Sequence, residues 1–104
     1  MTDQQKVDEC YATQPPEAAL ACIKEFVRTA EDPCRPKLVL LTQESCVPCS
    51  EERAIHKKAI NQGLIQEMSI DTPEGLAIAR KNNIDTVPVL ILVDCEDRVI
   101  LPSD

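Results

Sequence analysis

Aromatic side chains are almost absent from this 104-residue chain, which has one tyrosine, one phenylalanine and no tryptophan. Proteins that stack nucleic-acid bases on aromatic platforms need more of them, so this mode of binding is excluded. Apolar residues make up 43% of the chain and charged residues 28%, a balance typical of a globular protein. We therefore expect a single domain over residues 1–104 with a core of Ile, Leu, Val and Ala.

The chain also lacks a basic run. It carries 18 acidic residues against 11 lysines and arginines, which gives a formal net charge of −7. Nucleic acids and anionic membranes attract clustered positive charge, so we expect neither as a partner. An acidic domain instead favours protein partners with a basic face.

No apolar run is long enough to span a bilayer, and the first ten residues lack the apolar stretch of a secretory signal. These absences predict a cytoplasmic protein. In that compartment, six cysteines indicate redox chemistry or metal binding more often than a structural disulfide framework.

The spacing of apolar residues predicts alternating helices and strands. Helices are expected over 2–11, 17–31, 50–62 and about 72–82, and strands over 37–42, 64–70, 87–93 and 98–101. Strands joined by a helix usually pair in parallel, whereas the last two are close enough to form an antiparallel hairpin.

The expected fold class is therefore α/β, with a four-stranded mixed sheet flanked by helices over residues 36–104. An N-terminal helical segment, residues 1–35, precedes the sheet, and no C-terminal helix follows it. One sheet face would be half uncovered, and a monomer seldom leaves such an apolar face exposed. Either the N-terminal helices fill the gap, or the face forms a homodimer or partner interface.

Cys46 and Cys49 stand two residues apart in the stretch SCVPCS, between a predicted strand and a predicted helix. Backbone N–H groups and the helix dipole stabilise a thiolate at the start of a helix, so we expect a modestly lowered pKa for Cys46. Cys49 lies one turn further on, and Pro48 suits the first turn. This spacing and context are typical of a dithiol that attacks a substrate disulfide and is then released by its own second thiol.

Two other interpretations of the pair are a metal half-site and a static bridge. A zinc site usually needs a second pair of ligands, and none stands at ligand spacing, so we expect no metal. His56, seven residues after Cys49 and among charged neighbours, is interpreted as a solvated surface residue.

About forty residues after the cysteine pair, Thr86, Val87 and Pro88 precede a buried strand, and the bond before Pro88 is a candidate for the cis isomer. Cys-x-x-Cys after the first core strand and Val-Pro at the start of the third resemble the thioredoxin-like superfamily of thiol–disulfide oxidoreductases. The resemblance covers roughly residues 37–101.

This resemblance implies that Pro88 is cis and packs against the cysteine pair, while Val87 offers backbone hydrogen bonds to an extended substrate. Thr86, Val47 and Pro48 complete the implied substrate-binding set.

The chain departs from the superfamily's better-known branches. Thioredoxins proper carry a tryptophan before the first cysteine and a buried aspartate on the preceding strand, and both are absent here. Glu44, Glu51 and Glu67 are candidates to replace that aspartate. The basic residue and the Gly-Gly turn that glutaredoxins use for glutathione are also missing, so only the superfamily is indicated.

The expected function is a thiol–disulfide oxidoreductase that reduces protein disulfides without a cofactor, with Cys46 as nucleophile and Cys49 as resolving thiol. Its partners would be disulfide-bonded proteins and a reductase donor, with thioredoxin reductase and glutathione both open as electron sources. The alternative is a non-enzymatic thioredoxin-like binding module in which the cysteine pair is structural.

Four further cysteines lie outside the motif. If helices 2–11 and 17–31 form an antiparallel hairpin, Cys10 faces Cys22. In a thioredoxin-like sheet, Cys34 and Cys95 both lie at the end away from the active site. The candidate bridges are therefore Cys10–Cys22 and Cys34–Cys95, although a reducing cytosol favours the alternative that all four are reduced.

Overall fold

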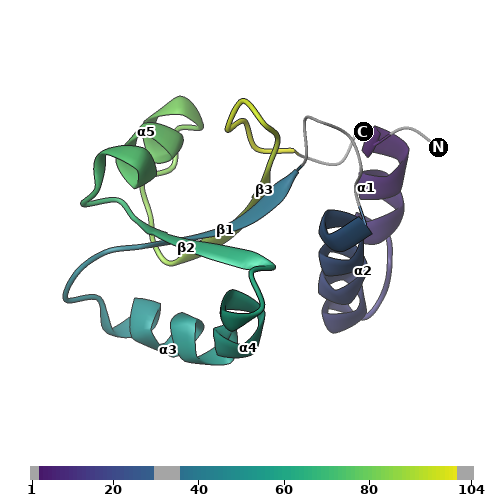
Figure 1. The fold of residues 1–104 in the computed structure, drawn as a ribbon, viewed down its shortest axis with the longest axis horizontal. Helices are drawn as coiled ribbons and strands as arrows, with labels where there is room; N and C mark the ends of the chain where they lie inside the picture. Colours follow the sequence, from purple (N-terminus) through teal and green to yellow (C-terminus); the bar gives the residue numbers. More distant parts are fainter. Residues whose placement is uncertain (1–2, 30–35, 101–104) are drawn as a thin grey trace.

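Eight helices and strands follow one another along residues 3–29 and 36–100, the part of the chain that the computed structural model describes (Figure 1). In chain order they are α1 (Asp3–Tyr11), α2 (Pro16–Thr29), β1 (Lys37–Thr42), α3 (Val47–Ile55), α4 (Lys57–Asn61), β2 (Ile65–Ser69), α5 (Pro73–Lys81) and β3 (Val89–Val93).

The sheet has the strand order β2-β1-β3, with β1 in the centre. β1 runs parallel to β2, with Leu38 opposite Ile65, and antiparallel to β3, with Leu41 opposite Val89. A central strand is buried on both faces, which accounts for the continuous apolar run of β1.

The prediction of a four-stranded sheet is wrong, because the described residues form three strands. Among the described residues of the expected strand, 98–100, Val99 forms an isolated bridge to Val93 of β3. In this bridge the backbone N–H of Asp94 donates to the Arg98 carbonyl and that of Ile100 to the Leu92 carbonyl. The backbone N–H of Val99 points away from β3 and donates to the side-chain oxygen of Asn82, at the end of α5. The Asp94 carboxylate accepts from the backbone N–H of Arg98 and holds the turn. The Asp94 carboxylate thus takes one N–H group that a longer ladder would have used, and pairing with β3 stays a single bridge among the described residues.

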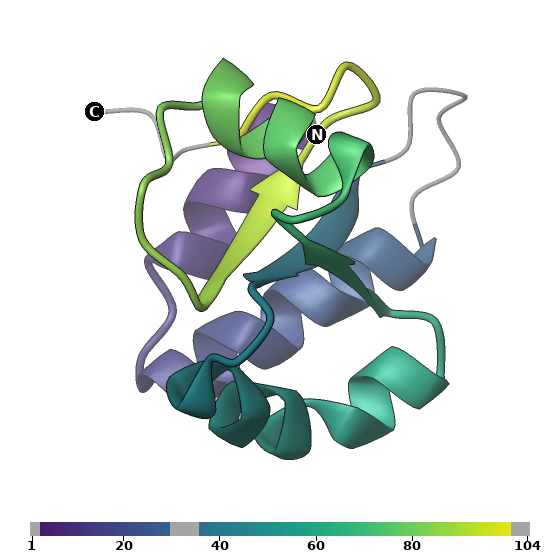
Figure 2. The same ribbon diagram turned by 90° about the vertical axis from the view of Figure 1, so that its left-hand side faces the viewer.

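Helices cover both faces of the sheet (Figures 1 and 2). Because side chains alternate along a strand, Leu38 and Leu40 point to one face, where they pack with residues of α1, α2 and α4. Val39 and Leu41 point to the other face and pack with α5. The N-terminal helices therefore fill the gap that the sequence analysis identified, and the uncovered face that suggested a homodimer is occupied.

A disulfide bridge joins the two N-terminal helices. Cys10 and Cys22 are bonded, with their Cα atoms 5.3 Å apart, within the reach that this candidate pairing requires. The Cys34–Cys95 pairing cannot be compared in the same way, because Cys34 lies outside the described residues.

The expected helix 50–62 begins earlier, at Val47, and is broken at His56. His56 is 8% exposed, and its Nε2 lies 3.3 Å from a carboxylate oxygen of Glu52. The interpretation of His56 as a solvated surface residue is therefore wrong. Its backbone leaves helical geometry, which ends α3 and starts α4 in a new direction.

Two predicted helix boundaries are confirmed. Gly63 has a φ of +79°, a left-handed conformation that suits glycine, and follows the end of α4. Thr72 caps α5, since its side chain accepts from the backbone N–H of Gly75, and Pro73 occupies the first turn.

Candidate functional site

The cysteine pair lies where the chain leaves the carboxyl end of β1 and begins α3. The connecting residues 43–45 are exposed, and the backbone N–H of Glu44 donates to the carboxylate of Asp71 at 2.9 Å. Cys46 has an extended backbone, and its Sγ accepts a hydrogen bond from the backbone N–H of Cys49 at 3.1 Å. The first cysteine is therefore the N-cap of the helix, as its place in the sequence indicated.

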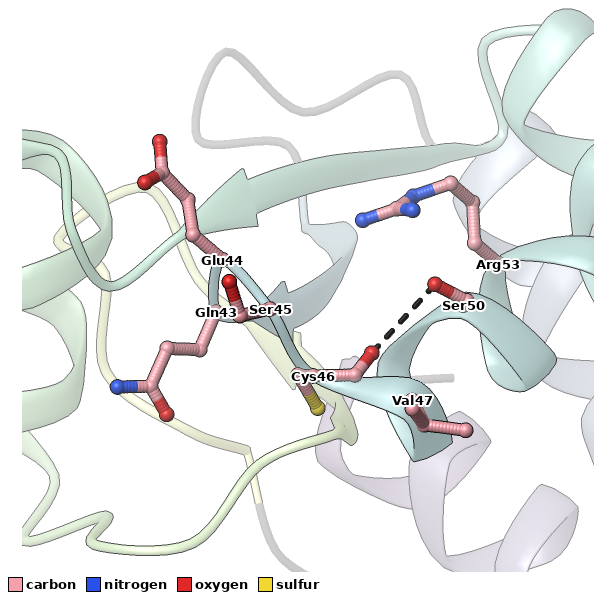
Figure 3. Close-up of a pocket in the computed structure, with 7 residues that line it drawn as sticks. All are labelled: Gln43, Glu44, Ser45, Cys46, Val47, Ser50 and Arg53. Atoms are coloured by element: carbon pink, nitrogen blue, oxygen red, sulfur yellow. Dashed lines mark hydrogen bonds between the residues drawn. The ribbon is translucent and has the colours of Figure 1, made fainter.

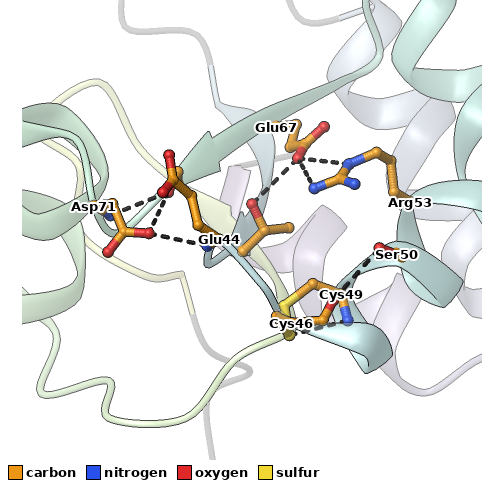
Figure 4. The surroundings of a disulfide bond; sticks show 9 residues. Glu44, Cys46, Cys49, Ser50, Arg53, Glu67 and Asp71 are labelled. Carbon is orange, nitrogen blue, oxygen red and sulfur yellow. Dashed lines mark hydrogen bonds and ion pairs between the residues drawn. A yellow bond between two sulfur atoms is a disulfide. The ribbon is translucent and has the colours of Figure 1, made fainter.

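Cys46 and Cys49 form a disulfide, with their Cα atoms 5.2 Å apart (Figure 4). The two cysteines differ in exposure: Cys49 is 0% exposed, whereas Cys46 is half-buried. An attacking reagent therefore has access to Cys46, while Cys49 is shielded within the protein.

Cys46 lines a cleft of about 370 Å³ (Figure 3). The other lining residues are Gln43, Glu44, Ser45, Val47, Ser50 and Arg53. Glu44 and Arg53 lie on opposite sides of this cleft, and Ser50 lies between Arg53 and Cys46 (Figure 3). The Ser50 hydroxyl donates to the backbone carbonyl of Cys46 at 3.4 Å.

An ion pair between Arg53 and Glu67 connects α3 to β2 beside the cleft. The Arg53 Nε donates to a carboxylate oxygen of Glu67 at 2.7 Å, and the Thr42 hydroxyl donates to the same oxygen at 3.2 Å. The hydrogen bond from Arg53 lowers the pKa of Glu67, although partial burial opposes this shift. Glu67 is thus held as a carboxylate.

The three carboxylates considered as substitutes for a buried aspartate occupy different surroundings. Glu44 and Glu51 are exposed, and Glu67 is half-buried in its pair with Arg53. In the part of the chain that the structure describes, residues 3–29 and 36–100, none of these three carboxylates makes a hydrogen bond with Cys46 or Cys49. Their assignment as proton acceptors for Cys49 stays a prediction.

The segment Thr86–Val87–Pro88 leads into β3, and the peptide bond between Val87 and Pro88 is cis, as expected. Val89, the next residue, pairs with Leu41. This register brings Pro88 to the end of β1 from which the cysteine loop departs. Val87 and Pro88 are half-buried and Thr86 is exposed.

The other residues of the expected substrate-binding set, Val47 and Pro48, lie in the first turn of α3. Both are exposed, and Val47 remains 71% accessible, which is high for an apolar side chain. The structure thus brings the cysteine pair, Val47 and Pro48 together and puts Thr86, Val87 and Pro88 at the same end of the sheet.

Sequence reasoning missed Ser50 and Arg53 as residues of the site. A usable signal was present, because positions four and seven residues after Cys46 fall on the same face of a helix.

Groups of three or more His, Cys, Asp or Glu side chains that could hold a metal ion do not occur in the described part of the chain. Among these same residues, no helix has both the length and the apolar composition to cross a membrane. Comparison with protein-family models, curated proteins and solved structures gives no match to this chain.

Proposed function

We propose that this protein is a thiol–disulfide oxidoreductase of the thioredoxin-like superfamily that reduces disulfide bonds in other proteins. The observation that carries the proposal is the unequal exposure of two bonded cysteines at a helix start, with Cys46 half-buried at the edge of a cleft and Cys49 fully buried. This arrangement suits a first thiol that meets the substrate and a second thiol that stays within the protein.

The chemistry begins from the reduced pair. The Cys46 thiolate attacks one sulfur of a substrate disulfide, so the substrate S–S bond breaks and a mixed disulfide forms on Cys46. The displaced substrate thiolate takes up a proton. The Cys49 thiolate then attacks the Cys46 sulfur and releases the second substrate thiol. The substrate gains two electrons, the protein keeps the Cys46–Cys49 disulfide, and an external dithiol or reductase returns it to the reduced state.

The backbone favours Cys46 as the nucleophile. The N–H of Cys49 donates to the Cys46 sulfur, and the N-terminal end of α3 adds the positive end of its dipole. Both interactions stabilise a thiolate at Cys46 more than a thiol. The exposed carboxylate of Glu44 opposes them.

The Thr86–Val87–Pro88 segment is the proposed docking edge for the substrate backbone. It lies at the end of the sheet from which the cysteine loop departs, given the pairing of Val89 with Leu41. An extended substrate that crosses this edge would bring its disulfide toward Cys46.

A non-enzymatic binding module is the alternative, and one observation favours it. The same chain holds a second disulfide, Cys10–Cys22, with a buried cysteine in the core. A Cys46–Cys49 bridge of the same structural kind would need no redox activity.

Reduction of a disulfide-bonded protein by dithiothreitol separates the two functions. We expect the wild-type protein to accelerate this reduction and Cys46→Ser to lower the rate to that of dithiothreitol alone. Cys22→Ala provides a matched control, because it also removes a bonded cysteine but leaves the cleft unchanged. Equal rates for wild type and Cys46→Ser would favour the binding module.

A further inference from the structure

A second cavity continues the Cys46 cleft along the helices. It has a volume of about 440 Å³ and shares Ser50 and Arg53 with the first cavity. Its other lining residues are Ala54, Lys57, Ile60, Asn61 and Glu67. We call the two cavities together the α3 trough. Cys46 lines one end of the trough, which runs along α3 and α4 as far as Asn61.

Four trough residues follow a helical spacing. Cys46, Ser50 and Arg53 lie on one face of α3, and Lys57 lines the same trough after the break at His56. At about 1.5 Å per residue, the helical path from Cys46 to Lys57 is roughly 16 Å long. An extended peptide covers that distance with about five residues, at roughly 3.3 Å each.

Charge is distributed unevenly along the trough. Glu44 lies at the Cys46 end, whereas Arg53 and Lys57 lie further along. Glu67 is already paired with Arg53, and the ion pairs described between residues 3 and 100 do not include Lys57. The far end is therefore cationic on a chain whose net charge is −7.

We infer that the α3 trough holds an extended segment of the substrate protein that carries acidic side chains four or five residues from its reactive cysteine. The cysteine would lie at Cys46 and the acidic side chains at Lys57 and the accessible edge of Arg53. A basic side chain at that distance would meet Lys57, whose charge none of the described ion pairs compensates, and would be disfavoured. This inference rests on the proposed function, since it assigns the substrate preference of the same cysteine.

Four peptides test the inference, each with a single cysteine linked through a disulfide to 2-nitro-5-thiobenzoate, whose release is followed by its absorbance. Two peptides carry a pair of aspartates at the fourth and fifth positions, either before or after the cysteine, and two carry lysines there. With the reduced wild-type protein, we expect the aspartate peptide to react about three- to ten-fold faster than its lysine counterpart on one side of the cysteine. The preference should shrink in 1 M salt, because the charges are exposed to solvent.

Charge reversal supplies the matched pair of variants. Lys57→Glu should abolish or reverse the preference for aspartate, whereas Lys58→Glu should leave it unchanged. Lys58 is the neighbouring exposed lysine and lines neither cavity, so it controls for the change in net charge. An equal effect of both variants, or equal rates for aspartate and lysine peptides on both sides, would overturn the inference.

Failure of the proposed function would give a different result. In that case thiobenzoate release from every peptide would be no faster with the wild-type protein than with Cys46→Ser. This result would contradict both the oxidoreductase function and the substrate preference of the trough. Fast release without charge preference would overturn only the trough assignment and leave the oxidoreductase proposal standing.

Discussion

Gly75 lies in the first turn of α5, directly against the end of β2. A Cβ atom at this position would lie 2.0 Å from the backbone carbonyl oxygen of Ser69. Backbone atoms cannot move aside as the end of a flexible side chain can, so helix and strand would have to separate. Gly63 differs, since a Cβ atom there would have no neighbour within 4 Å, but its φ of +79° strains any other residue.

The two glycines therefore predict unequal effects of the same substitution. Gly75→Ala should lower the free energy of unfolding by about 3 kcal/mol, the upper part of the usual range for overpacking. Gly63→Ala should lower it by about 1 kcal/mol, because only the backbone conformation is penalised. Urea unfolding of both variants measures the difference. Equal losses would contradict the close packing of α5 on β2.

Single residues were predictable where their role follows from a short stretch of sequence. The spacing of Cys46 and Cys49 indicated a bonded pair, and its position after a strand indicated the helix start. His56 was misinterpreted, because its burial depends on where the helix breaks and on which side of the helix then faces the core. Charged neighbours in the sequence do not report that orientation.

The pair of Arg53 and Glu67 acts at the level of elements, since it ties the cysteine-bearing helix α3 to the edge strand β2. Glu67 also accepts a hydrogen bond from Thr42, the last residue of β1. One carboxylate thus contacts three elements next to the cleft (Figure 4).

This contact predicts a pH-dependent contribution to stability. The pKa of Glu67 is lowered in the folded protein, so its stabilising contribution is complete above the unfolded value of about 4.3 and is lost as the pH falls through the folded value. Glu67→Gln should lower the thermal unfolding midpoint by a few degrees at pH 7, and the difference from wild type should shrink below about pH 4.

Glu51→Gln is the matched control, because it removes an exposed carboxylate of α3, the helix that bears Arg53. We expect it to change the midpoint less than Glu67→Gln at pH 7. A Glu67→Gln effect that stayed constant from pH 7 to pH 3 would exclude the ion pair as its cause.

Elements with local start and stop signals were predicted well, and those that depend on distant partners were not. Thr72, Pro73 and Gly63 mark helix ends through their own chemistry. The fourth strand failed because, among the described residues, pairing beside β3 stops at the single bridge from Val93 to Val99, and the Asp94 carboxylate takes the N–H group of Arg98. A pattern of apolar residues carries no information about that competitor.

At the scale of the whole molecule, the N-terminal helices provide a layer that covers the sheet. Ile23 and Phe26 of α2 and Val7 of α1 are buried with Leu38 and Leu40 of β1. The apolar stripe of residues 17–31 predicted that this helix packs on the sheet, but not on which face. The helix packs on the face that carries Leu38 and Leu40, where Ala59 of α4 also packs. The position of α4 on that face is known only once the whole chain is folded.

The disulfide within this layer predicts a separable stability effect. Replacement of both Cys10 and Cys22 by alanine removes a cross-link across 12 residues of sequence and should lower the free energy of unfolding by about 3 kcal/mol. Neither residue lines the cleft, so disulfide reductase activity below the unfolding transition should stay within about two-fold of wild type. Urea unfolding and the dithiothreitol-coupled assay measure the two effects. A folded double variant without activity would show that the hairpin contributes to the site.

The central claim is that Cys46 attacks a substrate disulfide and Cys49 resolves the mixed disulfide. The most direct test is mass spectrometry of reduced Cys49→Ser after incubation with a disulfide-bonded peptide, followed by mapping of the modified residue. The account predicts a stable adduct on Cys46 that dithiothreitol removes, little adduct on wild type, and none at residue 46 in Cys46→Ser. An absence of adduct on Cys46 in the Cys49→Ser variant would contradict it.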